Sequence, residues 1–143
     1  MRKAVNTIVK GRLYQRGQIL TWKYDEKVSL LNDLHVGVVV NFWPKVDPDM
    51  TDTWYFHLPS GSAEMMDPKI EYMACAVADL LRVDKSISAL ILCEAGKTRS
   101  VFFATLVMAD LLNIDTIQAY KKISKLLPTN KLKPFMANYL NHV

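Results

Sequence analysis

The chain has 143 residues, half of them hydrophobic and 22% charged, which suits a single compact domain over residues 1–143. A formal net charge of +4 favours anionic small-molecule or protein substrates and argues against a nucleic-acid-binding surface. The two cysteines have no metal-binding spacing and are too few for a disulfide framework. We therefore expect no metal and a reducing, cytoplasmic setting.

Neither the longest apolar stretch nor the start of the chain favours a membrane location. The longest apolar window, residues 101–112, is interrupted by Asp110 and cannot cross a bilayer. The basic start of the chain lacks the apolar core of a signal peptide. Within the domain, Cys75 is expected to be a small core residue, with a role as redox partner of Cys93 as the alternative.

The first third of the chain predicts strands and one helix. Residues 5–20 alternate in polarity and contain two glycines, which predicts a strand or hairpin at a sheet edge. Apolar residues at helical spacing predict an amphipathic helix over residues 25–34, capped by Asp25. Residues 35–42 form a β-branched run typical of a buried central strand, and residues 53–58 predict a third strand.

The rest of the chain predicts three helices around the central segment. An apolar stripe predicts a helix over residues 68–83. A later helix is expected to begin at a cap formed by Asp115 or Thr116 and to run through Leu126, before residues 128–130 break it. A last helix is expected from residue 131 to about residue 141. Alternating strands and helices predict an α/β fold: a central mixed, mostly parallel sheet flanked by helices.

The segment from Ser88 to Ser100 is where the sequence concentrates its chemistry. Residues 88–92 predict a strand buried on both faces, and a helix is expected from Thr98. Five residues between Cys93 and Arg99 can wrap so that backbone N–H groups point inward, beside the amide donors of the following helix. This arrangement predicts an anion site.

Four residues in this segment fit nucleophilic chemistry on a phosphate group. Gly96 permits a strained turn and close approach of the backbone to a ligand. Arg99 has a planar fork that can bind two phosphate oxygens at once. The same surroundings favour the thiolate of Cys93, which is the nucleophilic form, and Ser100 can hydrogen-bond this sulfur and ease its departure.

The pattern Cys93-x-x-Gly96-x-x-Arg99-Ser100 resembles the C-x-x-G-x-x-R-[S/T] signature of the cysteine-dependent protein tyrosine phosphatase superfamily, and the chain's size resembles its small dual-specificity branch. The resemblance implies a phosphate loop between a central strand and a helix, a phosphocysteine intermediate on Cys93, and no metal or other cofactor. It implies phosphate binding by Arg99 and by the loop residues Glu94, Ala95, Gly96, Lys97 and Thr98. The family usually has histidine before the cysteine, where this chain has Leu92.

The general acid is less clear, because the family commonly keeps an aspartate where this chain has Ser62. A positioned proton donor contributes typically about 10²–10⁴-fold to such reactions. Glu64 and Asp67 are the candidates from the same segment, and the alternative is that the enzyme works without a general acid. Asp67 directly before Pro68 is also typical of a helix N-cap, and Glu64 also fits a solvated side chain.

The substrate class stays open between several alternatives. Phosphorylated proteins are favoured, with a small phosphomonoester as the other possible partner and no nucleic acid or membrane span. The stretch Glu94-Ala95-Gly96-Lys97 is similar to the A-G-K crown of lipid and polyphosphate phosphatases, and Lys97 is placed to meet a second phosphate that Glu94 would repel. A phosphoinositide phosphatase, a phosphate-binding pseudophosphatase and a rhodanese-like sulfurtransferase are the further alternatives.

Overall fold

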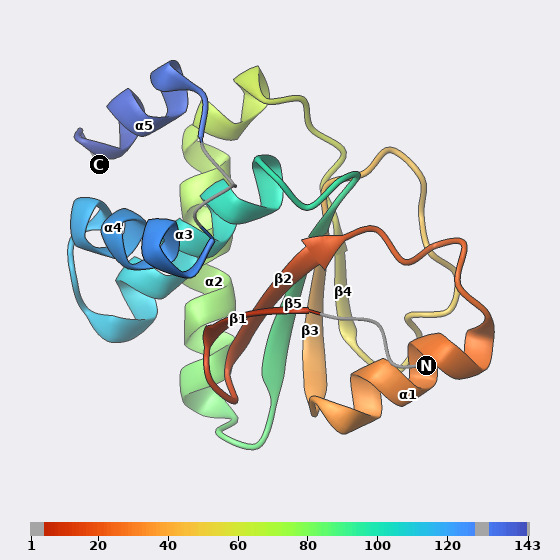
Figure 1. Ribbon diagram of the computed structural model, residues 1–143. Helices are drawn as coiled ribbons and strands as arrows, with labels where there is room; N and C mark the ends of the chain where they lie inside the picture. The colour runs from red at the N-terminus through yellow and green to blue at the C-terminus, as the bar shows by residue number, and fades with distance from the viewer. Residues whose placement is uncertain (1–4, 128–131, 143) are drawn as a thin grey trace.

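The computed structural model describes residues 5–127 and 132–142, and within them a five-stranded sheet with helices on both faces (Figure 1). The strand order is β1-β2-β5-β3-β4. The strands are β1 (Asn6–Val9), β2 (Leu13–Gly17), β3 (Val36–Asn41), β4 (Trp54–His57) and β5 (Ser88–Cys93). Only β1 is antiparallel to its neighbour, so the predicted mixed, mostly parallel α/β sheet is confirmed.

β5 is the middle strand of this sheet, and the N-terminal hairpin of β1 and β2 forms one side of it, with β1 at the edge. The turn between β1 and β2 contains Gly11, whose φ of +76° favours glycine. β2 pairs in parallel with β5 up to the partners Gly17 and Cys93, and β3 pairs with β5 on its other side up to Asn41 and Leu92. The strand that ends at Cys93 therefore has a neighbour on each side.

The helices form two unequal layers on the sheet (Figure 1). One face carries α1 (Tyr24–Asp33), and the other carries α2 (Pro68–Val83) and α3 (Arg99–Leu112), with α4 (Thr116–Leu126) against α3. The short η1 (Ala63–Met66) contacts α5 (Pro134–Leu140). Within β5, Ile91 belongs to the core under α2 and α3, and Leu90 and Leu92 to the core under α1. The strand is thus buried on both faces, as its continuous apolar run predicts.

The helix ends follow local hydrogen bonding, which confirms two predicted caps and corrects a third. Asp67 accepts from Lys69 N at 2.9 Å, and Asp115 accepts from Gln118 N at 2.7 Å. The prediction that Asp25 caps α1 is wrong, because Lys23 is the N-cap and its N–H donates to Glu26 Oε1 at 3.2 Å.

The last helix begins later than predicted. α5 starts at Pro134 rather than at residue 131, because proline suits the first turn, where its missing N–H is no loss. The predicted break at residues 128–130 and the predicted first residue of this helix, Lys131, lie outside the described residues.

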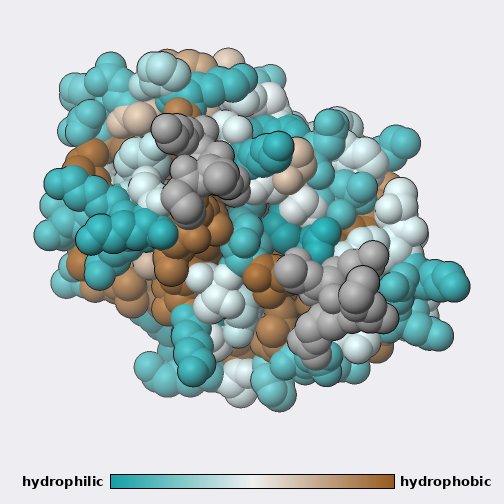
Figure 2. Space-filling view, in the orientation of Figure 1, coloured by the Kyte–Doolittle hydropathy of each residue, from teal (hydrophilic) through white to brown (hydrophobic). Residues whose placement is uncertain are grey.

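The face drawn in Figure 2 is mainly polar, with apolar areas between the polar side chains. Cys75 is exposed, so its prediction as a core residue is wrong. The buried stripe of α2 runs through its neighbour Ala74 and through Val77 and Ala78 instead. In residues 5–127 and 132–142, no helix is long and apolar enough to cross a membrane.

Candidate active site

The ends of four strands meet at one edge of the sheet, and Cys93 lies among them. Gly17, Cys93, Asn41 and His57 are the last residues of the parallel strands β2, β5, β3 and β4. In open α/β sheets, ligands bind beyond the carboxyl ends of the strands. The topology therefore places the predicted nucleophile where the fold has its binding crevice.

Cys93 and Ser100 form the centre of the site. The Cys93 Sγ atom lies 3.0 Å from Ser100 Oγ, across a loop of five residues that ends at the start of α3. Cys93 is 2% exposed and Ser100 is fully buried. The sequence prediction that Ser100 can hydrogen-bond the sulfur fits this geometry.

Gln15 on β2 holds this loop from below, a role that the sequence analysis missed. Its Nε2 donates to the Gly96 carbonyl oxygen at 2.5 Å and to Ser100 Oγ at 2.7 Å. Its Oε1 accepts from Asn6 Nδ2 at 2.8 Å. Gln15 is completely buried. A glutamine inside a strand that is otherwise apolar on its inner face was the available signal, because buried polar groups need partners.

Gly96 allows the loop to lie directly against the end of β2. Its φ is +70°, and a Cβ atom built on it would lie 2.3 Å from Gly17 N and 2.6 Å from the Arg16 carbonyl carbon. These neighbours are backbone atoms, which cannot swing aside as a flexible side chain can. The predicted need for glycine at this position therefore has two causes, the left-handed backbone and the close packing.

Arg99 is the first residue of α3, and backbone carbonyls from two other loops hold it. Its Nη1 donates to Phe42 O at 3.2 Å and to Ser60 O at 2.7 Å. These carbonyls follow β3 and β4, so three strand ends fix one guanidinium. Within the described parts of the chain, its Nε and Nη2 make no hydrogen bond, which leaves donors for a bound anion.

A pocket of about 160 Å³ opens at this site. It is lined by Cys93, Glu94, Ala95, Lys97, Thr98 and Arg99 of the loop and α3, by Ser62, and by Lys133. The pocket brings together all the predicted loop residues except Gly96, which is buried beneath it. Lys133, at the N-cap of α5, was not predicted, because its distance from the loop in sequence gives no sign of the contact.

The two candidate acids, Glu64 and Asp67, line a neighbouring hollow of about 290 Å³ rather than the pocket of Cys93. The Asp67 carboxylate caps α2, as described above. Glu64 is exposed, and its Oε2 lies 2.7 Å from the place that a Cβ on Gly61 would occupy. A catalytic role for either residue stays a prediction.

Trp43 connects the loop after β3 to the rim of the pocket. Its indole Nε1 donates to Glu94 Oε1 at 3.2 Å, and its carbonyl oxygen lies 2.7 Å from His57 Nε2. The Lys45 ammonium lies 5.4 Å from the Trp43 ring centroid, a cation–π distance. His57 is thus a hydrogen-bonded strand residue, as its position in a predicted strand indicates.

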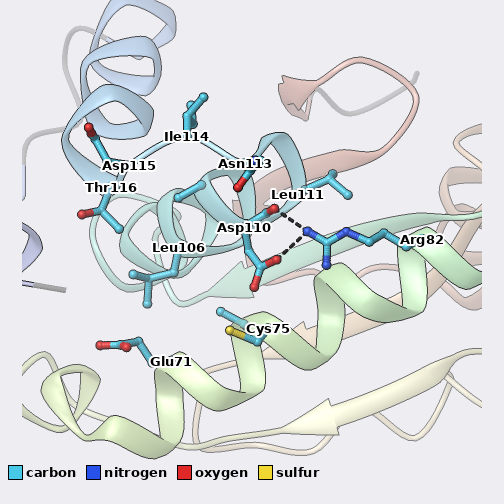
Figure 3. A pocket seen from close by; sticks show the side chains of 12 residues that line it. Glu71, Cys75, Arg82, Leu106, Asp110, Leu111, Asn113, Ile114, Asp115 and Thr116 are labelled. Atoms are coloured by element: carbon cyan, nitrogen blue, oxygen red, sulfur yellow. Dashed lines mark hydrogen bonds and ion pairs between the residues drawn. The ribbon is translucent and has the colours of Figure 1, made fainter.

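A second cavity lies away from this site, between α2, the end of α3 and the start of α4 (Figure 3). Its volume is about 620 Å³. Arg82 binds the Asp110 carboxylate at 2.5 Å across it. Hydrogen bonding to Asp110, together with burial, raises the pKa of the Cys75 thiol to about 11. A raised pKa disfavours the thiolate, which is the nucleophilic form of cysteine.

Comparison with known proteins shows a likeness at the level of the fold. No protein-family model matches the sequence, and no curated protein matches it. Among solved structures, Cydia pomonella PTP-2 phosphatase matches with a TM-score of 0.76 and 17% identity, over 98% of this chain and 89% of that chain. Human DUSP28 matches with a TM-score of 0.72 and 13% identity, over 99% of this chain and 93% of that chain. PTPMT1 in complex with PI(5)P matches with a TM-score of 0.74 and 13% identity, over 93% of this chain and 89% of that chain.

These likenesses define the fold of the chain. It is the fold of the dual-specificity branch of the cysteine-dependent protein tyrosine phosphatases, which the resemblance of residues 93–100 implied.

Proposed function

We propose that this chain is a cysteine-dependent phosphatase that hydrolyses phosphate monoesters, with phosphorylated tyrosine, serine and threonine side chains of proteins as favoured substrates. The observation that carries the proposal is the position of Cys93 Sγ at a strand end, 3.0 Å from Ser100 Oγ, with Arg99 opening the next helix. The phosphatases among the structural neighbours support the same reaction class.

In the proposed reaction the Cys93 thiolate attacks phosphorus in line, so that an S–P bond forms while the P–O bond to the leaving group breaks. Arg99 binds the equatorial oxygens with the donors that the carbonyls of Phe42 and Ser60 do not use. The leaving oxygen takes its proton from Glu64, Asp67 or water. Water then attacks phosphorus and breaks the S–P bond, and Ser100 donates to the departing sulfur.

The test is hydrolysis of p-nitrophenyl phosphate and of a phosphotyrosine peptide by the purified chain. We expect vanadate-sensitive turnover that Cys93→Ser abolishes and that Arg99→Lys lowers at least a hundredfold, because lysine lacks the bidentate fork. Cys75→Ser is the matched control, since it removes the other thiol, outside the pocket, and is expected to keep the wild-type rate. Turnover that survives in Cys93→Ser would refute the proposal.

One observation favours a second candidate, a phosphate-binding pseudophosphatase. Both candidate acids line a hollow other than the pocket of Cys93. In this case the protein binds the phosphotyrosine peptide with Arg99-dependent affinity and releases no phosphate from any ester. Titration calorimetry and phosphate release on the same samples separate the two functions.

A further inference from the structure

The pocket around Cys93 carries more positive charge than the Arg99 fork alone. Lys97 from the loop and Lys133 from the start of α5 line it as well, and both lysines are exposed. They come from segments far apart in the sequence and reach the same rim. Strongly hydrated ammonium groups at a pocket mouth attract a further anionic group of the bound molecule.

Glu94 is the one acidic residue in this lining, and its carboxylate is tied to the neighbouring loop. Trp43 Nε1 donates to its Oε1 at 3.2 Å, which draws the negative charge toward the Trp43 side of the rim. The described residues include every aspartate and glutamate of the chain, because the positions outside them are of other types. The lining therefore keeps an excess of positive charge.

The side chain at the place of the family's acid is a hydroxyl, that of Ser62, and this bears on the leaving group. An alkoxide leaves with difficulty unless a group protonates it, whereas a phosphate group has a second pKa of about 6 and leaves as a stable anion at neutral pH. Glu64 and Asp67, which would supply the proton, lie in the adjacent hollow. The pocket thus suits a leaving group that is itself a phosphate.

We propose that this site also hydrolyses phosphoanhydrides, taking the terminal phosphoryl group of a diphosphate or triphosphate chain. The inference rests on the proposed cysteine chemistry and adds a substrate class to it. Cys93 attacks the terminal phosphorus, the S–P bond forms, and the bridging P–O bond breaks with its electron pair going to the shortened phosphate chain. Lys97 and Lys133 hold this leaving phosphate. Water then breaks the S–P bond and releases orthophosphate, one proton and the free thiolate.

The experiment measures orthophosphate release from tripolyphosphate and p-nitrophenol release from p-nitrophenyl phosphate, with EDTA present to exclude metal-dependent hydrolysis. The variants are Cys93→Ser and the double variant Lys97→Ala/Lys133→Ala. The matched control is Lys121→Ala/Lys122→Ala, which removes the same charge from exposed positions on α4. Thermal unfolding of each variant shows that it is folded.

We expect hydrolysis of tripolyphosphate that Cys93→Ser abolishes. The pocket double variant should lower kcat/KM for tripolyphosphate at least tenfold more than for p-nitrophenyl phosphate, and the α4 double variant should change this ratio less than twofold. If p-nitrophenyl phosphate is hydrolysed and tripolyphosphate is not, the inference is wrong and the proposed function stands. If neither is hydrolysed, the proposed function fails as well. Pocket-lysine-dependent hydrolysis of a polyol with two vicinal phosphate monoesters, without hydrolysis of tripolyphosphate, also overturns the inference.

Discussion

The side-chain amide of Gln15 donates to Ser100 Oγ across 2.7 Å, and this contact orients the serine hydroxyl. The Gly96 carbonyl can only accept a hydrogen bond, so the end of the Gln15 amide that faces it at 2.5 Å is the NH₂ group and not the oxygen. Because Ser100 Oγ accepts from that same group, its own proton is available to the Cys93 sulfur 3.0 Å away. A residue of the N-terminal hairpin thus holds the hydroxyl group that lies beside the nucleophile.

Replacing Gln15 by methionine, which has a similar volume, removes both hydrogen bonds to the loop. We expect a loss of unfolding free energy of about 1–3 kcal/mol, since two buried hydrogen bonds of the Gln15 amide are lost. We also expect kcat for p-nitrophenyl phosphate to fall, because Ser100 is no longer oriented. Urea unfolding and steady-state kinetics measure the two effects. Asn6→Ala, one contact further out, should have a smaller effect on both, and equal effects would contradict this role for Gln15.

Gly96→Ala and Gly11→Ala separate backbone strain from close packing. Both glycines have positive φ, +70° and +76°, but a Cβ atom on Gly11 meets nothing within 4 Å. Gly11→Ala should therefore lower the free energy of unfolding only by the cost of placing alanine in a left-handed backbone conformation, about 1–2 kcal/mol. Gly96→Ala adds a clash with the backbone of β2, so we expect a larger loss of stability together with loss of phosphatase activity. Equal losses of unfolding free energy in the two variants would show that packing at Gly96 is unimportant.

Lys27 fixes the loop after β3 from inside the structure. Its ammonium, on a residue 2% exposed, binds Asp47 Oδ1 at 3.0 Å and Asp49 Oδ2 at 2.8 Å. Burial alone would lower the pKa of Lys27, but the two aspartates raise it. Lys27→Met leaves the buried Asp47 uncompensated, so we expect it to cost about 3–5 kcal/mol in urea unfolding. The double variant Lys27→Met/Asp47→Asn should recover part of this loss; no recovery would argue against the ion pair as the cause.

The protonated Cys75 thiol contributes to stability, and this contribution is lost at alkaline pH. Its pKa is raised from 9.0 to about 11 in the folded protein by Asp110, so the folded state holds a proton that the unfolded state has lost between these values. This contribution is complete below pH 9.0 and disappears as pH rises toward 11. Cys75→Ala should therefore show a flatter decline of unfolding free energy over this range. An unchanged slope between wild type and variant would remove Cys75 as its source.

Substitutions of Asp67 distinguish a capping role from a catalytic one. Asparagine caps helices as well as aspartate, whereas alanine costs typically about 1 kcal/mol. We expect Asp67→Asn to keep the stability of α2 and to lower kcat less than tenfold, and Asp67→Ala to lower the melting temperature. A fall in kcat of a hundredfold or more in the stable Asp67→Asn variant would instead identify Asp67 as the general acid.

The sequence predicted the architecture well because its buried strands are apolar and its helix starts carry local signals. The run Leu90-Ile91-Leu92 before Cys93 indicated a strand buried on both faces, and Asp67 before Pro68 indicated the start of a helix. Such signals depend on neighbours within a few residues. Asp25 misled for the same reason: several residues near a helix start can cap it, and Glu26 bonding to Lys23 decided the outcome.

The candidate site was predictable only where its residues are close in sequence. Residues 93–100 form a compact pattern, and the structure assembles them around one pocket. The partners from elsewhere, Gln15, Trp43 and Lys133, were not found, because their contacts exist only after β2, the loop after β3 and α5 are packed together. Phe42 and Ser60 act through their carbonyl groups, which every residue type has, so no sequence pattern marks them.

The bond from Gln15 to Ser100 spans 85 positions of the chain, and this separation limits what a fragment of the protein can do. A polypeptide that starts after the hairpin keeps the whole signature, yet it lacks the strand beside β5 and the amide beneath the loop. During translation the hairpin is made before its partner, so the contact between Gln15 and Ser100 can form only after the 85 positions that separate them have been made. Truncation at the amino end should therefore silence the protein as completely as loss of the cysteine itself.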